Sequence, residues 1–230
     1  MIIKGFQRLT LLDFPGKTAC TLFTGGCNFR CPFCHNGSLV LPERFFDEFF
    51  SEEEIFDFLD KRRGRLGGVC ISGGEPTLQA DLPTFIEKIK ALGYAVKLDT
   101  NGYRPDVLRS LCEGGLIDYV AMDIKNSKEL YAKTAGLDKF DISLIERSAD
   151  FLLGGSLPFE FRTTVVRGLH DEKSIEDIGR WLRGGESYFL QGYTESEDII
   201  SPVFDGYTKN ELNNLLNLLR QYIPNAQIRG

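Results

Sequence analysis

The sequence has no long apolar run and no surplus of positive charge. No stretch of its 230 residues approaches 18 consecutive apolar residues, and the first 17 lack the apolar core and small-residue cleavage site of a secretory signal. The formal net charge is -6, so the chain lacks the basic excess that binding to nucleic acid or anionic lipid requires. We therefore expect a cytoplasmic protein whose partners are proteins or small molecules, with no nucleic acid and no membrane.

The sequence also lacks the cysteine pattern of a disulfide framework. Three of its six cysteines are clustered within eight residues, at Cys27, Cys31 and Cys34. The other three are scattered at Cys20, Cys70 and Cys112. Clustered thiols in a chain without a secretion signal indicate a metal rather than disulfides. The scattered cysteines lie in or beside apolar runs, and small buried side chains are the simplest interpretation for them.

Short β-rich runs alternate with amphipathic helical patterns along the chain. The six runs that predict strands are 19–24, 69–72, 94–99, 118–124, 159–166 and 187–191. Helices are expected near 51–59, 81–92, 104–112, 141–153, 173–183 and 208–222. This alternation favours parallel βαβ units, in either a doubly wound sheet or an incomplete eightfold barrel. No repeat or linker divides the chain, so we predict one domain, 1–230.

The clustered cysteines directly follow the first predicted strand and the pair Gly25-Gly26. The carboxyl end of a parallel strand is where α/β folds place their active sites. Three thiolates suit an iron-sulfur cluster, whose usual complement is four, so one iron would stay open to a ligand. The alternative is a structural zinc site, which would need a closed fourth ligand such as His35 or Cys70. The sequence has no second C-x-x-C or Cys/His pair of the usual kind.

The spacing C-x-x-x-C-x-aromatic-C, with Phe33 as the aromatic residue, resembles the signature of radical S-adenosylmethionine enzymes. The resemblance implies one 4Fe-4S cluster on Cys27, Cys31 and Cys34. It also implies that the open iron takes the amino and carboxylate groups of S-adenosylmethionine, with Phe33 or its backbone lying against the adenine. The fold implied is a partial (β/α)6 TIM-type barrel of six parallel strands with outer helices, open at one side to a peptide loop.

Further residues at the ends of later predicted strands resemble the same family. Gly73, Gly74 and Glu75 in the run Ser-Gly-Gly-Glu-Pro are similar to its methionine-binding motif. Glycines there would let backbone groups approach a ligand closely, and Pro76 favours an extended Glu75. Such a run on its own is more often an ordinary turn.

Asp99, Thr100 and Asp123 resemble residues of the activase subgroup, which installs a glycyl radical in a partner enzyme. The resemblance implies that they bind S-adenosylmethionine and a monovalent cation, for which oxygen ligands are suitable. An Asx turn and a structural Asp-Lys pair are the plainer interpretation. Lys125 would neutralise carboxylate charge, and Arg162 would pair with the carboxylate or ribose of the ligand.

Three other polar positions carry weaker signals. Gln191 stands where activases often have a histidine, so a ribose contact there departs from the family pattern. His35-Asn36 matches the activases, although a surface-loop histidine fits equally well. His170 receives no role.

The implied chemistry is reductive cleavage of S-adenosylmethionine to a 5′-deoxyadenosyl radical, with flavodoxin or a similar electron donor. The cofactors would carry this reaction, so no general acid or base is assigned. The start GFQRLTLLDFPGK is most similar to the activating proteins of anaerobic ribonucleoside-triphosphate reductase, which implies that this glycyl radical enzyme is the partner. The alternatives are a pyruvate formate-lyase-type activase, a radical enzyme acting on a small molecule, and a non-catalytic zinc-binding module.

Overall fold

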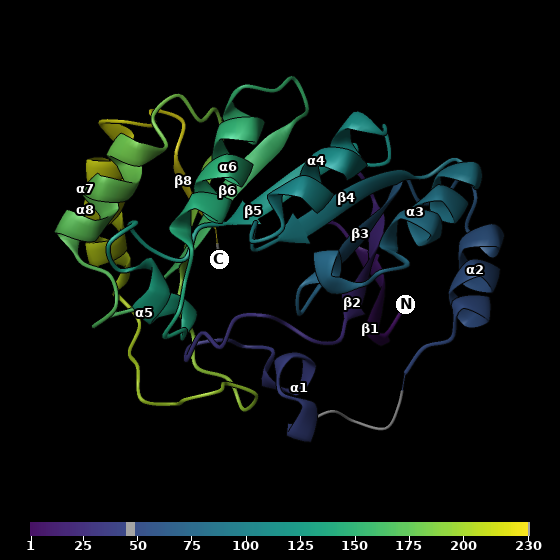
Figure 1. The fold of residues 1–230 in the computed structure, drawn as a ribbon, viewed down its shortest axis with the longest axis horizontal. Coiled ribbons are helices and arrows are strands. Elements are labelled where there is room, and N and C mark those ends of the chain that lie inside the picture. The colour runs from purple at the N-terminus through teal and green to yellow at the C-terminus, as the bar shows by residue number, and fades with distance from the viewer. Residues whose placement is uncertain (45–48, 230) are drawn as a thin grey trace. The chain divides into compact units, whose positions relative to one another are not determined.

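The computed structural model describes residues 1–44 and 49–229 as two compact units (Figure 1). The first unit takes Met1–Asn28, Ser38–Thr100 and Arg104–Val120. The second takes Phe29–Gly37, Asn101–Tyr103 and the chain from Ala121 onward. Neither unit is a continuous stretch of sequence, because the chain passes between them more than once. The single domain spanning 1–230 stays a prediction.

The first unit is built on a sheet with one antiparallel edge. Its strands are β1 (Ile3–Thr10), β2 (Ala19–Thr24), β3 (Gly68–Gly73) and β4 (Ala95–Thr100). β1 pairs antiparallel with β2, whereas β2, β3 and β4 are mutually parallel neighbours. Leu22, Ile71 and Leu98 lie in register across the three parallel strands and are fully buried, which places the core on them.

Helices connect these strands as the predicted βαβ units require. They are α2 (Glu52–Lys61), α3 (Leu82–Ala91) and α4 (Pro105–Glu113). Shorter helical segments are α1 (Gly37–Val40), η1 (Pro42–Arg44) and η2 (Pro76–Leu78). α2 begins at the predicted cap: the Ser51 side chain accepts from the Glu54 N–H, and the Glu54 carboxylate accepts from the Ser51 N–H.

The second unit continues the same alternation. Its strands are β6 (Phe159–Val165), β7 (Tyr188–Gly192) and β8 (Gln227–Arg229), which are parallel neighbours in this order. β5 (Tyr119–Asp123) is divided between the two units. The helices are α5 (Tyr131–Ala135), α6 (Ile142–Leu153), α7 (Glu172–Trp181) and α8 (Lys209–Arg220).

The α/β class and all six predicted strands are confirmed, as β2 to β7. The described residues form two further strands, β1 and β8, in addition to the six predicted. β1 escaped prediction because Gln7, Arg8 and Leu9 are exposed on an edge strand and break any apolar alternation. β8 has only three residues, too few for a periodic pattern.

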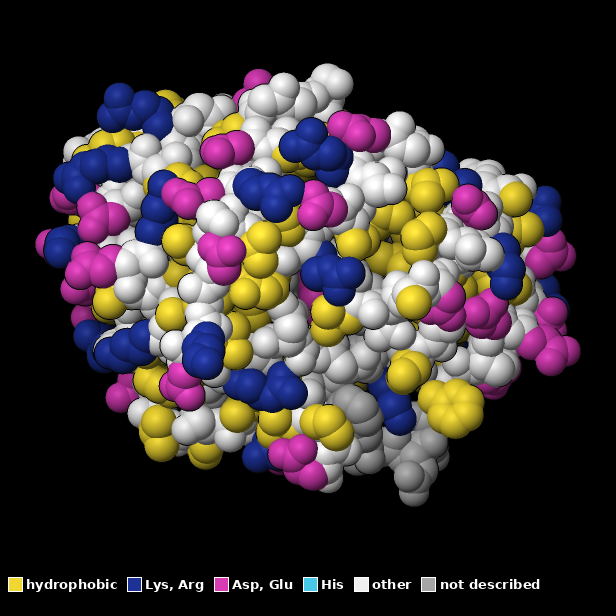
Figure 2. All heavy atoms as spheres, in the orientation of Figure 1, with side chains coloured by type: hydrophobic (Ala, Val, Ile, Leu, Met, Phe, Trp, Pro, Cys, Tyr) yellow, Lys and Arg dark blue, Asp and Glu magenta, His cyan; other side chains and the backbone are white. Residues whose placement is uncertain are grey.

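The surface agrees with the absence of a basic excess. Basic and acidic side chains are interspersed over the face shown in Figure 2. Within the described ranges, no helix combines the length and apolar character needed to cross a membrane.

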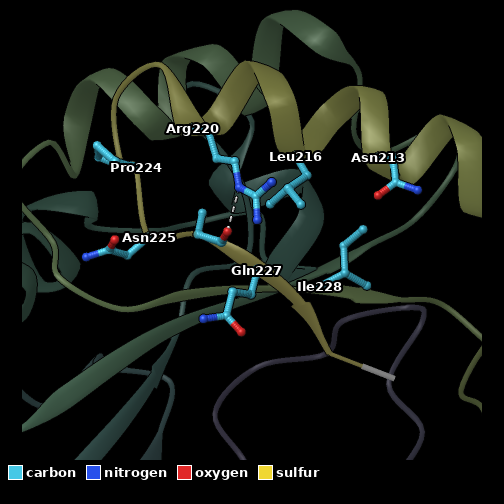
Figure 3. Close-up of a pocket in the computed structure, with 8 residues that line it drawn as sticks. Asn213, Leu216, Arg220, Pro224, Asn225, Gln227 and Ile228 are labelled. Carbon is cyan, nitrogen blue, oxygen red and sulfur yellow. Dashed lines mark hydrogen bonds between the residues drawn. The ribbon is translucent and has the colours of Figure 1, made fainter.

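A groove of about 580 Å3 lies between α8 and the segment that leads into β8 (Figure 3). It is lined by Asn213, Leu216, Arg220, Pro224, Asn225, Ala226, Gln227 and Ile228. The Arg220 Nε donates to the Ala226 carbonyl at 2.9 Å across it. None of these residues is among the predicted site residues, so the groove is not the candidate active site.

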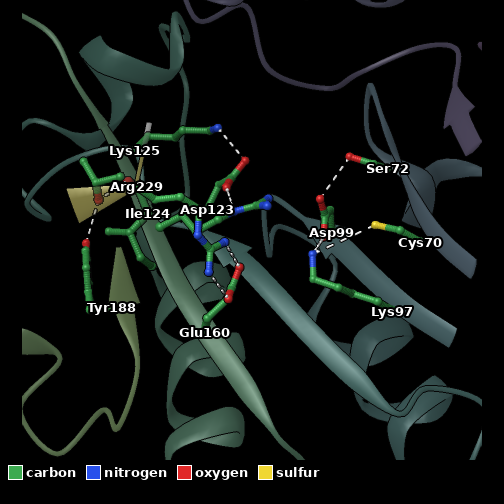
Figure 4. Close-up of polar contacts among 12 residues, drawn as sticks. Cys70, Ser72, Lys97, Asp99, Asp123, Ile124, Lys125, Glu160, Tyr188 and Arg229 are labelled. Atoms are coloured by element: carbon green, nitrogen blue, oxygen red, sulfur yellow. Dashed lines mark hydrogen bonds and ion pairs between the residues drawn. The ribbon is translucent and has the colours of Figure 1, made fainter. Parts of the chain in front are cut away.

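The short strand β8 is held by an ion pair between the partly exposed Arg229 and the buried Glu160. The two terminal nitrogens of Arg229 donate to the two Glu160 carboxylate oxygens at 2.7 and 2.9 Å (Figure 4). Glu160 on β6 is fully buried, and the Arg229 guanidinium lies 3.5 Å from the Phe189 ring centroid. A bidentate pair of this kind is among the stronger polar contacts in proteins.

We expect Arg229→Ala to lower the free energy of unfolding by about 3 kcal/mol, because Glu160 would stay buried without its counter-charge. Chemical denaturation followed by circular dichroism measures this loss. The exposed Arg65 provides the control, since Arg65→Ala should change stability by less than about 0.5 kcal/mol. Equal losses in the free energy of unfolding for the two variants would contradict a stabilising role for the Arg229–Glu160 pair.

Candidate active site

The cysteine loop, residues 27–37, follows β2. All six cysteines are thiols rather than disulfides, as expected for a metal-binding cluster. Cys31 is buried, whereas Cys27 and Cys34 are partly exposed. Burial raises the pKa of the Cys34 thiol, against the opposing effects of the Asn36 backbone and the Lys125 charge. A metal that binds there must therefore displace a proton.

The middle of the loop is anchored in the second unit by aromatic rings and by the end of α5. Phe29 is 2% exposed, and its ring makes edge contacts with those of Tyr103, Tyr131 and Phe140 at centroid distances of 5.6 to 6.5 Å. These contacts fix the chain between Cys27 and Cys31 by burying a large ring.

The end of α5 contacts the backbone of Arg30, the residue after Phe29 in the cysteine loop. The Arg30 N–H donates to the Ala135 carbonyl at 2.9 Å. Gly136 caps α5 in the left-handed conformation at φ +69°, and a Cβ there would lie 2.1 Å from the Arg30 carbonyl oxygen. Only glycine therefore allows this approach.

The end of the loop is anchored by a segment that follows β7. The Ser201 N–H donates to the Pro32 carbonyl at 2.8 Å, and the Ile200 N–H donates to the Cys34 carbonyl at 3.2 Å. Within the loop, the Cys34 N–H donates to the Cys31 carbonyl at 3.0 Å. Residues 198–201 carry no sequence signal for this role, because backbone contacts leave no trace in side-chain patterns.

In the first unit, Gly73, the last residue of β3, and Gly74 approach the end of β2 closely. Gly73 has φ +114°, and a Cβ on it would lie 2.2 Å from the Thr24 nitrogen. A Cβ on Gly74 would lie 2.0 Å from the Gly26 carbonyl oxygen, to which the Glu75 N–H donates at 2.8 Å. These glycines therefore allow a close approach to the chain's own backbone, immediately before Cys27.

Glu75 lies at the start of η2 with its carboxylate fully buried. Its backbone is extended, with φ -132° and ψ 105°, as expected before Pro76. One carboxylate oxygen accepts from the Thr77 N–H at 3.1 Å, the Thr77 hydroxyl at 2.5 Å and the Thr100 hydroxyl at 2.7 Å. The side chain thus links the ends of β3 and β4.

Asp99 at the end of β4 has two polar partners in the first unit. Lys97, which is 1% exposed, pairs with one carboxylate oxygen of Asp99 (Figure 4). The Ser72 hydroxyl donates to the other oxygen at 3.1 Å. Lys97 was not among the predicted site residues. A lysine inside the apolar run YAVKLD is nevertheless a sequence signal that indicates a buried, paired charge.

Asp123 at the end of β5 occupies a comparable position in the second unit. Lys125 donates to one of its carboxylate oxygens at 3.1 Å, and the Arg162 Nε donates to the other at 2.9 Å. The Tyr131 hydroxyl also donates to the Asp123 carbonyl at 3.2 Å. Arg162, which was expected to pair with the ligand, therefore has Asp123 as a partner within the protein, and its role toward the ligand stays a prediction.

Phe33 and His170 lie side by side in the second unit, with ring centroids 6.4 Å apart. The Val166 N–H donates to His170 Nδ1 at 3.1 Å, so Nε2 carries the proton and donates to the Lys125 carbonyl at 2.8 Å. Burial lowers the pKa of His170, which keeps this ring neutral near pH 7. Gln191 on β7 lies in register with Thr164 on β6.

The structure distributes the predicted site residues over both units. The first unit contains Cys27, Gly73, Gly74, Glu75, Asp99 and Thr100. The second contains Cys31, Phe33, Cys34, Asp123, Lys125, Arg162 and Gln191. Contacts join Glu75 to Thr100 in the first unit, and Asp123 to Lys125 and Arg162 in the second.

Comparison with known families identifies the chain. A family model described as "Radical SAM superfamily" matches residues 21–182, which include the three clustered cysteines. The chain belongs to the radical SAM superfamily. Parallel strands connected by helices, as seen here, are typical of the partial barrel of this superfamily.

Relatives differ in how much of their length they share with this radical SAM chain. A Methanocaldococcus jannaschii protein named "Putative glycyl-radical enzyme activating enzyme MJ1227" is 34% identical over 99% of this chain and 95% of its own length. A "Probable GTP 3',8-cyclase" of Thermococcus kodakarensis is 31% identical over 64% of this chain and 47% of its own. The first alignment thus extends from end to end, and the second does not.

Solved structures support the fold. SuiB of Streptococcus suis superposes with a TM-score of 0.71 at 15% identity, covering 91% of this chain. The chain spans about half of SuiB, since only 48% of that protein is covered. A SuiB structure bound to S-adenosylmethionine also matches, with a TM-score of 0.70.

Membership of this superfamily implies a 4Fe-4S cluster and S-adenosylmethionine. The donor set fits a cluster, because three thiols stand within eight residues on a loop that is anchored on both sides of Cys31. Among the described residues, no three His, Cys, Asp or Glu side chains converge to hold one metal ion. Thiolates of a cluster bind different irons, so they do not need to converge on one atom.

The expected monovalent cation does not fit these residues as they stand. In the first unit, Asp99 pairs with Lys97, and the Thr100 hydroxyl donates to Glu75. In the second unit, Lys125 and Arg162 both pair with Asp123. Positive charges of the protein already neutralise both carboxylates, and they would repel a further cation.

Proposed function

We propose that this chain is an activase that reductively cleaves S-adenosylmethionine and generates a glycyl radical on a partner enzyme. The end-to-end match to a protein named as a glycyl-radical enzyme activating enzyme carries the proposal. The proposed partner is anaerobic ribonucleoside-triphosphate reductase, on the resemblance of residues 5–17 to its activating proteins.

The roles of the chain's own residues follow from their chemistry. Cys27, Cys31 and Cys34 would hold a 4Fe-4S cluster, and backbone carbonyls after β3 would accept from the ligand's amino group. When bound and reduced, the cluster supplies the electron that splits S-adenosylmethionine into methionine and a 5′-deoxyadenosyl radical. Phe33 offers an apolar ring to the adenine, and its edge contact with the neutral His170 holds that ring in place.

The charged residues at the strand ends would orient the ligand. The planar guanidinium of Arg162, whose Nε donates to Asp123, is proposed to contact the carboxylate or ribose of the ligand, for which its geometry is suitable. Asp99 and Asp123 are partly exposed, at 12% and 31%, so each presents an edge to a ligand. Gln191 is proposed for a ribose contact. The chain thus contributes alignment rather than proton transfer, and an electron donor such as flavodoxin completes the system.

Electron paramagnetic resonance tests this function. The iron-loaded, reduced chain is mixed with S-adenosylmethionine and the reductase, and we expect the doublet of a glycyl radical on the reductase. The Cys31→Ala variant is the control and should give no doublet. A doublet with pyruvate formate-lyase alone would reassign the partner.

A small-molecule reaction is the second candidate, because the Thermococcus kodakarensis relative is named as a GTP cyclase. That match covers only about half of the relative, so the rest of its chain has no counterpart here. Incubation of the reduced enzyme with GTP and S-adenosylmethionine discriminates the two candidates. GTP consumption together with the absence of any glycyl signal would favour the second candidate.

A further inference from the structure

A lysine is buried in the middle of β4, within the first unit. Lys97 is 1% exposed, and its neighbours Val96 and Leu98 are fully buried. Lysine is almost never fully buried unless its ammonium is paired, because removing that charge from water is costly. The position therefore requires a counter-charge close by.

Asp99 supplies the counter-charge. Lys97 and Asp99 are two residues apart on a strand, so their side chains leave the same face of the sheet. Cys70 is the register partner of Lys97 on β3, and its sulfur lies 3.9 Å from the Lys97 ammonium. The Tyr119 ring centroid lies 6.0 Å from the same ammonium. Figure 4 shows Lys97 directed toward Asp99 and Cys70.

The pairing fixes the Asp99 carboxylate from both sides. Lys97 contacts one oxygen, and Ser72, two residues after Cys70, donates to the other. The carboxylate therefore cannot rotate without breaking one of these contacts. Thr100, the next residue, is fixed through Glu75. The end of β4 is thus preorganised by the protein alone.

We propose that Lys97 is a positioning residue whose ammonium is the built-in counter-ion of Asp99 and takes the place of a dissociable monovalent cation there. The inference rests on the proposed function, because Asp99 is among the residues proposed to bind S-adenosylmethionine. An ammonium carries the same charge as an alkali cation, and its tether to the same strand prevents it from leaving. Ligand binding then has no requirement for sodium or potassium.

The test is the affinity of the iron-loaded protein for S-adenosylmethionine, measured by calorimetry in potassium, sodium or choline chloride at one ionic strength. For the unaltered protein we expect the three affinities to agree within twofold. Lys97→Met should weaken binding of S-adenosylmethionine at least tenfold in choline chloride. Potassium chloride should restore part of the lost affinity of this variant. Lys88→Met removes an exposed, ion-paired lysine of the same unit and should behave like the unaltered protein.

Each outcome has a separate meaning. The inference would be overturned if the unaltered protein bound S-adenosylmethionine several-fold more tightly in potassium than in choline. It would also be overturned if Lys97→Met kept full affinity. No binding of S-adenosylmethionine in any salt would instead refute the proposed function.

Lys97→Met leaves the Asp99 carboxylate without its ammonium partner, and this variant could misfold for that reason. A second variant that removes this charge as well provides a control. Lys97→Met combined with Asp99→Asn leaves no isolated carboxylate and should bind weakly in every salt. The thermal midpoint of the iron-free protein provides a readout without the ligand. We expect it to be the same in potassium and choline for the unaltered chain and for the double variant, and a shift of several degrees in the unaltered chain would contradict a built-in counter-ion.

Discussion

Replacement of Cys27, Cys31 or Cys34 by alanine is expected to abolish the binding of about four irons and four sulfides per chain. Cys20→Ala and Cys112→Ala should leave that binding intact. Cys20 is fully buried on β2, and burial raises the pKa of its thiol to about 12. Burial likewise raises the pKa of Cys112 to about 11. Both thiols also lie outside the loop of residues 27–37, Cys20 on β2 and Cys112 on α4.

Iron and sulfide analysis after anaerobic reconstitution measures this effect. The two control variants test whether any cysteine-to-alanine change disturbs loading. Stoichiometric zinc with no iron in the unaltered protein would contradict the cluster and return the chain to the zinc-module alternative. Iron loading that survives loss of Cys31 would show that the thiols have been wrongly assigned.

The second large effect is expected at Gly136, which lies outside the cysteine motif. A methyl group at this position would lie 2.1 Å from the Arg30 carbonyl oxygen, which belongs to the backbone beside Cys31. Gly136→Ala must therefore move the cysteine loop or break the hydrogen bond from Arg30 to Ala135. We expect a loss of about 3 kcal/mol in the free energy of unfolding and a severe loss of iron loading.

Gly115 provides a matched control for this substitution. Its φ of +67° is nearly that of Gly136 at +69°, but nothing lies within 4 Å of a Cβ built on it. Gly115→Ala therefore adds only the strain of a left-handed alanine, about 1 kcal/mol, and should load iron normally. Denaturation curves measure the free energy of unfolding of the two variants, and iron analysis measures their loading. Equal iron content would show that contact with the cysteine loop does not determine loading.

Much of the fold could be predicted from sequence because its longer elements carry their own patterns. The strand at 19–24 and the helix capped by Ser51 are recognisable locally, and the structure reproduces both. Elements fixed by distant contacts could not be recognised in this way. β8 depends on an ion pair with Glu160, 69 residues earlier, and the five-residue α5 is too short to show a helical period.

The same distinction between local patterns and distant contacts applies to the candidate site. The clustered cysteines could be identified because their spacing alone defines a donor set. The partners of the acids could not, since they depend on which strands become neighbours. Lys97 faces Cys70 only because β3 and β4 pair in parallel, and Arg162 reaches Asp123 from 39 residues away. The roles of these residues toward the ligand stay predictions.

The anchors of the cysteine loop set an order of events during synthesis. A ribosome that has released the first 130 residues has exposed all three clustered cysteines, but it has not yet released Ala135, Gly136 or residues 200–201. The nascent loop then lacks the backbone partners of Arg30, Pro32 and Cys34. Iron delivered at that stage would meet an unshaped peptide with competing geometries. Cluster insertion should therefore be post-translational, and chains arrested before residue 201 should bind iron poorly despite carrying every ligand.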